Sequence, residues 1–497
     1  MCRLTKSSRH DEPALNSKRE LAQEGARARW SRSGSGEPGA SARRSVRALK
    51  FCDTIREQPR PSRRQAAIRL GLIGVGTVGS GTLHVLKEHR QEIERRLGCR
   101  IEVERVCSRN IHKKDLSWFG RSVKRTSNWR EVVTDPAVDI VIELVGEPST
   151  ARAIALAALE AGKHLVTANK QLVAEHGLEL VERSRARQLS LGIEATVAGG
   201  TPILHAIREG LAGEHFDAVF GILNGTTNYI LTEMERRGTT FADALAEAQA
   251  KGYAEPDPTF DVEGFDARYK IAILAMVCFG QAVRVSDIPT RGIREIDQVD
   301  FAYARRLERT VRLIGAAGRR QGRLEISVRP LMIPRSSQLA SVLGATNGIM
   351  LVGKKGGVTT VTGRGAGGEA TGVAVLSDVV EIARTLTAGG SGVTPLGYAH
   401  WHPARIASPG KNVVGTYLRL VVRDRPGILA RVSAILARHR INIDSVLQEP
   451  AMPKQHLPFV MTLEPTQENR VARAVEEISR LSFMAQRPVL LPFADLP

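Results

Sequence analysis

The chain has 497 residues, enough for several domains with sizeable cores. Its hydrophobic content of 42% and charged content of 25% are ordinary for a globular protein, and no stretch reaches the roughly 18 consecutive apolar residues of a membrane span. The five cysteines are scattered without a Cys-x-x-Cys pair, which argues against a zinc site or a disulfide framework and predicts a reducing, cytoplasmic setting.

The formal net charge of +19 is unevenly distributed along the chain. Residues 1–65 contain 16 Lys and Arg against 7 Asp and Glu, and they carry about half of the positive excess. This segment is rich in Arg, Ser, Gly and Pro and has no periodic apolar pattern, so we predict a disordered basic extension. We favour a tail without a function over one that contacts nucleic acid or a membrane surface, and we expect neither as a partner.

Residues 66–195 alternate short apolar runs with amphipathic segments. Predicted strands cover 67–73, 101–107, 138–144 and 164–167, and predicted helices cover 80–97, 129–133 and 150–161. Strands that alternate with helices are typical of βαβ units around a parallel sheet. We therefore predict an α/β chain that begins with a Rossmann dinucleotide-binding domain.

Residues 196–388 have a mixed pattern that predicts an α+β domain. Predicted strands cover 216–223, 324–333, 348–352 and 357–362, and predicted helices cover 241–251 and 265–279. A last helix over 371–388 could return to the first domain. Residues 389–412 are rich in Gly, Pro and Ser and are a plausible linker.

Residues 413–495 read as strand, helix, two strands, helix and strand. The predicted strands cover 417–422, 441–447, 458–463 and 488–492, and the predicted helices cover 428–438 and 468–481. The order βαββαβ predicts a ferredoxin-like domain.

A glycine-rich motif connects the first predicted strand to the first predicted helix. The residues are Gly74, Val75, Gly76, Thr77, Val78 and Gly79. In this context the first glycine permits the turn, the second lets the backbone approach a pyrophosphate and the third allows close helix–strand packing. The N-terminus of the helix supplies N–H donors for phosphates. We predict a dinucleotide site; an ordinary turn is the alternative.

The end of the second predicted strand indicates which dinucleotide binds. The sequence there is Cys-Ser-Arg-Asn, with no acidic residue to hold a ribose diol. Arg109 could instead face a 2′-phosphate, which favours NADP over NAD. A solvated loop arginine is the alternative.

Two lysines are candidates for proton transfer. Lys170 follows a parallel strand, at the edge of the sheet where ligands bind, although many lysines in such places are only solvated. Lys270 lies four residues after Asp266 on an apolar helix, so the two share a face. A buried lysine needs a partner and can serve proton transfer; a routine surface pair is the alternative.

Five segments, in this order, closely resemble homoserine dehydrogenases: GLIGVGTVGSGT, TANKQLVAEHG, EATVAGGTPI, GILNGTTNYILTEM and GYAEPDPTFDVEGFDARYK. The resemblance covers about residues 66–490, and the last two segments are the most specific. It implies NADP- or NAD-dependent, reversible hydride transfer between L-homoserine and L-aspartate 4-semialdehyde, in the biosynthesis of threonine, methionine and isoleucine. It also implies that residues 196–388 form the catalytic and dimerisation domain of a homodimer or homotetramer.

The resemblance implies roles for the polar residues of the last segment and for Lys170. Lys270 and Lys170 would transfer the proton at the reacting oxygen, with Lys270 as the main acid–base group. Asp261 and Asp266 would orient the substrate and Lys270. Glu255 would bind the amino group of the substrate.

Further residues would complete the substrate, cofactor and cation sites. Gly225 and Thr226 would line the substrate pocket, and Gly367 and Glu369 would approach the nicotinamide side. The family also holds a monovalent cation, usually sodium, and hard oxygen ligands suit such an ion. Its expected ligands are Glu194 and the main-chain carbonyls of Val197, Gly199 and Thr201.

The sequence VRDRPGILARVSAILARHRINIDSV in the third domain resembles an ACT domain. Such domains bind amino acids at paired interfaces, so the resemblance implies regulation, with L-threonine as the expected inhibitor. Asp424, Gly427, Ile428 and Asn442 would form the regulatory site. A domain that only assembles subunits is the alternative.

Two other functions compete with this interpretation. An aspartate-semialdehyde dehydrogenase would need a cysteine nucleophile to form a thioester, and no cysteine lies in a convincing motif. A non-catalytic regulator that binds dinucleotide and amino acid would tolerate loss of Lys170 or Lys270, yet both are present.

Overall fold

The computed structural model describes residues 67–497 except 121, 391–396, 399–401, 409 and 449–453. The predicted basic extension over 1–65 and part of the predicted linker lie outside the described residues. All described residues belong to one compact unit, Pro61–Pro497. Of the helices in the described ranges, none is long and apolar enough to cross a membrane.

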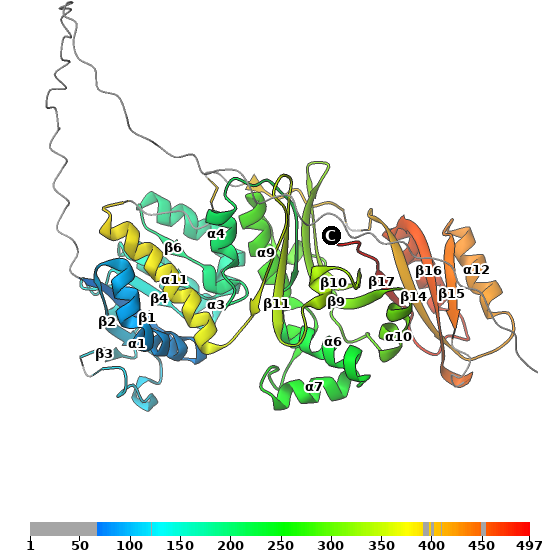
Figure 1. Ribbon diagram of the computed structural model, residues 1–497, viewed down its shortest axis with the longest axis horizontal. Helices are drawn as coiled ribbons and strands as arrows, with labels where there is room; N and C mark the ends of the chain where they lie inside the picture. Colours follow the sequence, from blue (N-terminus) through cyan, green and yellow to red (C-terminus); the bar gives the residue numbers. More distant parts are fainter. Residues whose placement is uncertain (1–66, 121, 391–396, 399–401, 409, 449–453) are drawn as a thin grey trace, which may run out of the picture. The chain divides into compact units, whose positions relative to one another are not determined.

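Six parallel strands form the first sheet, in the order β3-β2-β1-β4-β5-β6 (Figure 1). They are β1 (Ala67–Ile73), β2 (Arg100–Cys107), β3 (Lys124–Thr126), β4 (Ile140–Glu143), β5 (His164–Thr167) and β6 (Leu191–Gly192). This order is that of the Rossmann fold, in which a ligand binds at the carboxyl edge where the strand order reverses, here between β1 and β4. The predicted Rossmann sheet is confirmed.

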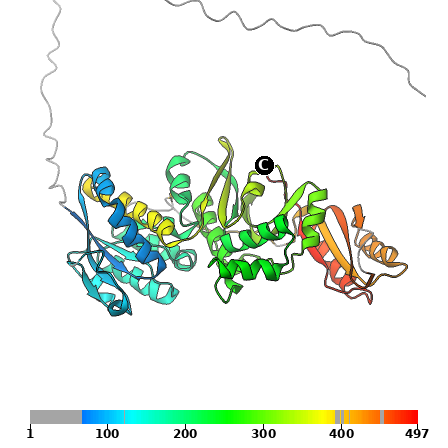
Figure 2. The ribbon, with the colours of Figure 1, turned by 60° about the horizontal axis from the view of Figure 1, so that its bottom comes forward.

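Helices cover both faces of this sheet, which explains why its strands read as continuous apolar runs. One face carries α1 (Thr77–Leu97) and α11 (Gly368–Thr387), and the other carries α2 (Arg130–Val133), α3 (Pro148–Glu160) and α4 (Lys170–Ala186). Helices α1 and α11 lie side by side although they are far apart in the sequence (Figure 2). The packing of α11 therefore joins the end of the second domain to the first sheet.

The second sheet is antiparallel, in the order β10-β9-β7-β11-β12. Its strands are β7 (Phe216–Ile222), β9 (Arg309–Arg320), β10 (Arg323–Pro334), β11 (Thr346–Gly353) and β12 (Gly357–Arg364). Helices α6 (Gly225–Arg237) and α9 (Phe265–Phe279) pack on one face. Nearly every side chain of α9 is buried, as expected for a helix that is apolar all round.

The opposite face of the second sheet is covered by the chain itself. Leu339 and Val342, in and after the short helix η5 (Gln338–Ser341), pack there together with Leu496 from the C-terminal tail. The Ala494 N–H donates a hydrogen bond of 3.0 Å to the Met332 carbonyl and fixes the tail to β10.

The C-terminal sheet has the order β15-β16-β14-β17, which is the ferredoxin-like arrangement that the sequence predicts. Its elements are β14 (Val413–Val422), α12 (Ile428–Arg438), β15 (Ile443–Gln448), β16 (Leu457–Gln467), α13 (Glu468–Ser479) and β17 (Val489–Pro492). Buried β14 side chains contact α10 (Gln298–Arg306) of the second domain: Arg419 Nε lies 3.0 Å from Asp300 Oδ1, and the Tyr417 hydroxyl donates to the same oxygen at 2.8 Å.

Candidate active site

The glycine-rich loop between β1 and α1 has the geometry of a phosphate-binding turn. Gly74 has φ +106°, and a Cβ there would lie 2.6 Å from the Leu144 carbonyl oxygen. A Cβ at Gly79 would lie 2.0 Å from the Gly74 carbonyl oxygen, whereas a Cβ at Gly76 would meet no atom within 4 Å. Helix α1 has no side-chain cap, so its first N–H groups are available to an anion.

The N-terminus of α11 lies against this loop. A Cβ at Gly368 would be 2.6 Å from the Thr77 carbonyl oxygen. The predicted cofactor residues Gly367, the N-cap, and Glu369, in the first turn, are therefore beside the glycine-rich loop, and both are exposed. Arg109 is also exposed, in the turn that follows β2.

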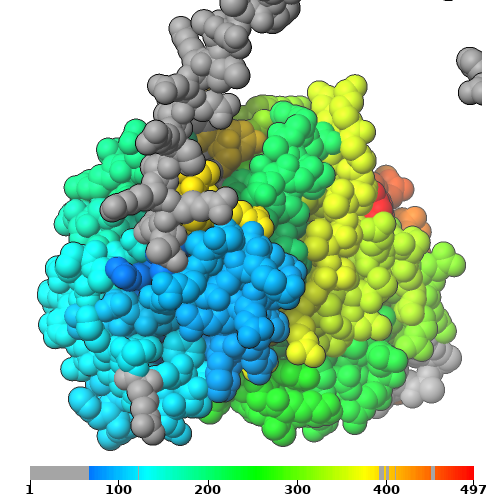
Figure 3. Space-filling view, turned by 60° about the vertical axis from the view of Figure 1, so that its left-hand side comes forward, coloured from blue at the N-terminus to red at the C-terminus, as the bar shows by residue number. Residues whose placement is uncertain are grey.

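Asp266 brings the two predicted lysines together. Lys170 is the first residue of α4, while Asp266 and Lys270 lie one turn apart on α9. Lys170 Nζ lies 3.0 Å from Asp266 Oδ1, and Lys270 Nζ lies 2.7 Å from Asp266 Oδ2. The ammonium groups come from two different domains, whose surfaces adjoin in Figure 3, where the first is blue and cyan and the second green and yellow.

Asn224 organises the carboxylates of this centre. It caps α6, because its Oδ1 accepts a hydrogen bond from the Thr227 N–H at 2.8 Å. Its Nδ2 donates to Asp261 Oδ1 at 2.7 Å and to Asp266 Oδ2 at 2.9 Å. No helix was predicted over Gly225–Arg237, yet this segment is helical. An Asn three residues before Thr227 is a cap signal that could have revealed the start of the helix.

The Leu223 carbonyl, directly after β7, fixes the ammonium of Lys270. It accepts hydrogen bonds from Lys270 Nζ at 2.8 Å and from Asn347 Nδ2 at 3.0 Å. Asn347 is fully buried, and nothing in the sequence pattern marks it. The buried Lys270 thus has a carboxylate and a carbonyl as partners, as a buried cation requires.

Burial and the two ammonium groups act in opposite directions on the carboxylates. Burial alone would raise the pKa of Asp266, but Lys270 and Lys170 hold it well below its usual range. Burial also lowers the pKa of Lys170, yet the charges of Asp266, Asp261 and Glu255 offset this and raise it overall. The pKa of Asp261 is raised by burial and by the neighbouring Asp266 charge. The centre therefore favours a charged Lys170 beside an ionised Asp266.

The remaining predicted substrate residues surround this centre. The Thr226 hydroxyl donates to the Tyr253 carbonyl at 2.7 Å, and a Cβ at Gly225 would lie 2.7 Å from the Ala345 carbonyl oxygen. Glu255 is exposed, close enough to Lys170 to affect its pKa. The Phe260 ring lies 5.5 Å from Lys170 Nζ.

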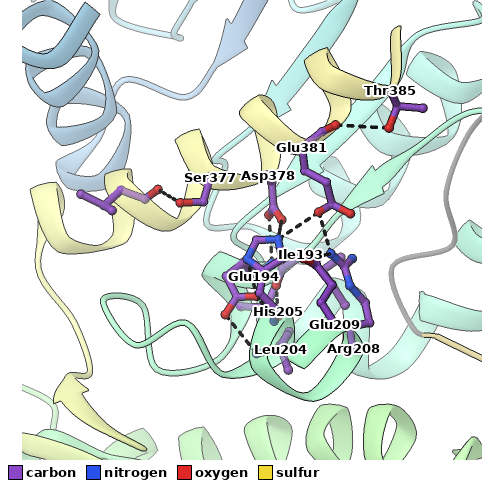
Figure 4. A network of polar contacts seen from close by, with 12 residues as sticks. Ile193, Glu194, Leu204, His205, Arg208, Glu209, Ser377, Asp378, Glu381 and Thr385 are labelled. Carbon is purple, nitrogen blue, oxygen red and sulfur yellow. Dashed lines mark hydrogen bonds and ion pairs between the residues drawn. The ribbon is translucent and has the colours of Figure 1, made fainter. Parts of the chain in front are cut away.

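The predicted cation residue Glu194 lies in a polar network with α11 (Figure 4). Its carboxylate accepts hydrogen bonds from the Leu204 N–H at 3.0 Å and the His205 N–H at 2.7 Å. The His205 Nε2 lies 2.9 Å from Glu381 Oε2 and 3.4 Å from Asp378 Oδ1. The carboxylate of Glu194 thus has protein partners of its own.

Within one chain, the predicted regulatory residues lie at the two opposite ends of the C-terminal sheet. The end of β14, where Val422 pairs with Leu457, leads to Asp424, whereas the start of β15, where Ile443 pairs with Leu463, follows Asn442. Asp424 and Gly427 belong to the turn between β14 and α12, Gly427 has φ +87° as the N-cap, and Ile428 is buried. Asn442, just before β15, donates from Nδ2 to Glu464 Oε2 at 3.0 Å.

Comparisons with known proteins agree across the chain. Family models match residues 74–194 as "Homoserine dehydrogenase, NAD binding domain", 202–380 as "Homoserine dehydrogenase" and 416–483 as "ACT domain". The homoserine dehydrogenase of Pseudomonas aeruginosa is 38% identical over 420 residues, covering 83% of this chain and 96% of that protein. That of Neisseria gonorrhoeae is 36% identical, covering 85% and 98%.

Solved structures of homoserine dehydrogenases are also similar to this chain. The crystal structure of a homoserine dehydrogenase from Thiobacillus denitrificans has a TM-score of 0.77 and 38% identity, covering 87% of this chain and 99% of that chain. A hyperthermophilic archaeal homoserine dehydrogenase in complex with NADPH has a TM-score of 0.55 and 27% identity, covering 64% and 97%.

Proposed function

The chain belongs to the homoserine dehydrogenase family, and we propose that its Lys170–Asp266–Lys270 centre handles the proton that accompanies hydride transfer between L-homoserine and L-aspartate 4-semialdehyde. As a family member the chain is an oxidoreductase with an NAD-binding domain. The observation that carries the proposal is the bridging of two lysines from different domains by one buried carboxylate.

The chemistry requires a proton donor at the carbonyl oxygen of the aldehyde. A nicotinamide dinucleotide, when bound, would supply or take up the hydride. As negative charge grows on the oxygen, the ammonium of Lys270 stabilises it and delivers a proton, and in the reverse direction the amine accepts one. Lys170 adds a second positive charge at the same place. Asp266 orients both, and Asp261 supports Asp266 through Asn224.

The amino group at the other end of the substrate needs an acidic side chain to bind it. Glu255 is exposed near Lys170 and would hold the amino group of the substrate. Gly225 and Thr226 would line the pocket at the start of α6. A carboxylate that binds this amino group would select an amino-acid aldehyde over a simple one.

The reaction is tested by mixing purified protein with L-aspartate 4-semialdehyde and NADPH or NADH, and by following loss of the reduced nicotinamide. Oxidation of L-homoserine with NADP tests the reverse direction. Turnover in both directions supports the proposal. A folded protein that binds NADPH but turns over neither substrate would instead favour the non-catalytic, dinucleotide-binding regulator.

NADP is the proposed cofactor, because the turn after β2 has Arg109 and no acid to hold a ribose diol. Replacing Arg109 with Ser is expected to raise the KM for NADPH about tenfold or more, since a charge-assisted hydrogen bond contributes roughly 1.5–3 kcal/mol. The KM for NADH is expected to change little. An equal effect on both cofactors would show that Arg109 does not read the 2′-phosphate.

A monovalent cation, sodium by resemblance, is proposed at the turn that follows Glu194. Thr201 Oγ1 is buried without a hydrogen-bond partner, so a hard oxygen is free beside the turn. The main-chain carbonyls of Val197, Gly199 and Thr201 would supply the other ligands. Because its carboxylate already accepts two N–H groups, Glu194 would contribute mainly negative charge. The bound ion would stabilise the connection between the domains.

L-Threonine is the proposed effector, binding at the interface of paired ACT domains through Asp424, Gly427, Ile428 and Asn442. Replacing Asp424 with Ala is expected to raise the threonine concentration for half-inhibition about tenfold, as removal of one charged hydrogen bond does. Arg438→Gln, which removes a surface pair with Glu477, is the matched control. If threonine does not inhibit the wild-type protein, the ACT domain has only a structural role.

Assembly and location are proposed from the family resemblance and from the cysteines. The family resemblance supports a homodimer or homotetramer built on the second domain. The described cysteines, Cys99, Cys107 and Cys278, are unpaired, which supports a reducing compartment such as the cytoplasm.

A further inference from the structure

Glu143 is a buried acid for which the proposed reaction has no use. It is the last residue of β4 and is 0% exposed. Its Oε1 accepts a hydrogen bond from the Val145 N–H at 2.5 Å, and its Oε2 accepts one from the Thr167 hydroxyl at 2.7 Å. Because β4 and β5 are paired with Glu143 opposite Thr167, these bonds lie at the carboxyl edge of the sheet.

The hydrogen bonds continue from Thr167 to the start of α4. Thr167 Oγ1 accepts from the Asn169 N–H at 3.0 Å, and Asn169 Nδ2 donates to the Val145 carbonyl at 3.0 Å. Asn169 Oδ1 also caps α4 by accepting from the Leu172 N–H at 3.0 Å. The next residue along the chain is Lys170. A closed set of hydrogen bonds through Glu143 therefore fixes the turn that carries this lysine.

Only the ionised form of the Glu143 carboxylate allows every hydrogen bond of this closed set to form. It only accepts hydrogen bonds, so the Thr167 hydroxyl can donate to it while accepting from Asn169. If Glu143 is protonated on Oε2, the proton is directed at Thr167 Oγ1, and the Thr167 hydroxyl hydrogen loses its acceptor. Glutamine would create the same conflict through its amide N–H.

We propose that Glu143 is a positioning residue for the reaction: its carboxylate, acting through Thr167 and Asn169, holds Lys170 at Asp266 and at the reacting oxygen. The inference rests on the role proposed above for Lys170. It adds a residue that contacts neither substrate nor cofactor.

Glu143 can also make the activity depend on pH. Burial raises the pKa of Glu143 to about 7, although the hydrogen bonds from Thr167 and Val145 oppose this. Since the ionised form is the productive one, activity is expected to rise with pH through this range as Glu143 loses its proton.

The charged residues on the strands and helices around Glu143 do not take the place of Thr167 and Val145 as its hydrogen-bond partners. Lys170 and Glu147 are the first charged residues after β5 and β4, while β1 presents Ile73 opposite Glu143. On the covering helices, several charged side chains have partners of their own: Arg152 with Glu179, Glu160 with Arg183, and Asp378 and Glu381 with His205.

The test compares Glu143→Gln with wild type by kcat, KM and pH profile, together with NADPH affinity by fluorescence. We expect kcat to fall by up to about 100-fold, as a small misplacement of a reacting group can cause, with NADPH affinity unchanged. The rise in activity near pH 7 should disappear, because the variant cannot ionise. The matched control is Glu179→Gln on the outer side of α4, which should keep both kcat and the profile.

A second pair of variants, at Thr167, tests the inference even if the Glu143→Gln protein does not fold. Thr167→Ser keeps the hydroxyl and should retain the wild-type kcat and pH profile, whereas Thr167→Val should lose both. Equal behaviour of Ser and Val, or an unchanged pH profile in a folded Glu143→Gln, would overturn the inference. Lys170→Met separates the two proposals. If it retains full activity, the role of Lys170 fails; if it loses activity while Glu143→Gln does not, only the role of Glu143 fails.

Discussion

An Asp266→Asn protein is expected to lose about 3–5 kcal/mol of unfolding free energy, and nearly all of its activity. Removing one partner of a buried ion pair has a cost of this size, because the remaining charge is left uncompensated. Here two ammonium groups depend on one carboxylate that is 4% exposed. The stability loss should lie near the lower value, since a third of the Lys170 side chain is exposed. Urea denaturation and kcat measure the two effects.

The pH dependence of this loss has a defined sign. The pKa of Asp266 is lower in the folded protein than in the unfolded chain. Its contribution to the free energy of unfolding is therefore complete above the unfolded pKa of about 3.9, and it is lost as the pH falls through the folded pKa. The difference between variant and wild type should therefore be constant near neutral pH. Asp287→Asn, which breaks an exposed pair with Arg284, is the control and should change stability by less than about 1 kcal/mol. Equal losses in both variants would contradict the account.

A Lys270→Met protein is expected to bind NADPH normally and to have a kcat about 10²- to 10⁴-fold below wild type, the usual contribution of a general acid–base group. The side chains are similar in size, and only the ammonium that faces Asp266 and the Leu223 carbonyl is lost. Steady-state reduction of L-aspartate 4-semialdehyde measures the effect. Lys251→Met, at an exposed pair with Glu247, is the matched control. A kcat within a few-fold of wild type would remove Lys270 from the reaction.

The sequence predicted those elements whose periodicity and ends are both distinct. Helix α9 has the predicted bounds, because a mostly apolar segment lies between Gly264 and Gly280, and both glycines have positive φ. Strand β5 also has its predicted bounds. The βαββαβ order of the C-terminal domain followed from alternating strands and strongly amphipathic helices.

The elements that were not predicted have local sequence patterns that do not favour them, and tertiary contacts stabilise them instead. Strand β9 was not predicted, because its Gly and Ala residues have low β propensity and its buried Arg312 makes sense only with Glu235, 2.8 Å away on α6. Helix α6 was not predicted either, since it begins at Asn-Gly-Thr-Thr, which is rich in turn-forming residues.

Only part of the candidate site could be predicted from local sequence patterns, because tertiary contacts bring the rest together. The spacing of Asp266 and Lys270 on one helix placed them together, but no local pattern could bring Lys170 to the same carboxylate across a domain boundary. Asn224, Asn347 and Glu143 were missed, because each forms hydrogen bonds with carboxylate, main-chain or hydroxyl groups that only the fold brings near. These are the contacts that hold the centre in place.

The most direct test of this centre is a kinetic double-mutant cycle with Lys170→Met, Lys270→Met and the double variant. If both lysines act at one reacting oxygen through Asp266, the cycle is strongly non-additive: the double variant has a kcat close to that of the worse single variant, as residues that work as a unit do. If the two losses in kcat instead multiply, the lysines act independently, and the centre described here is not where the proton is transferred.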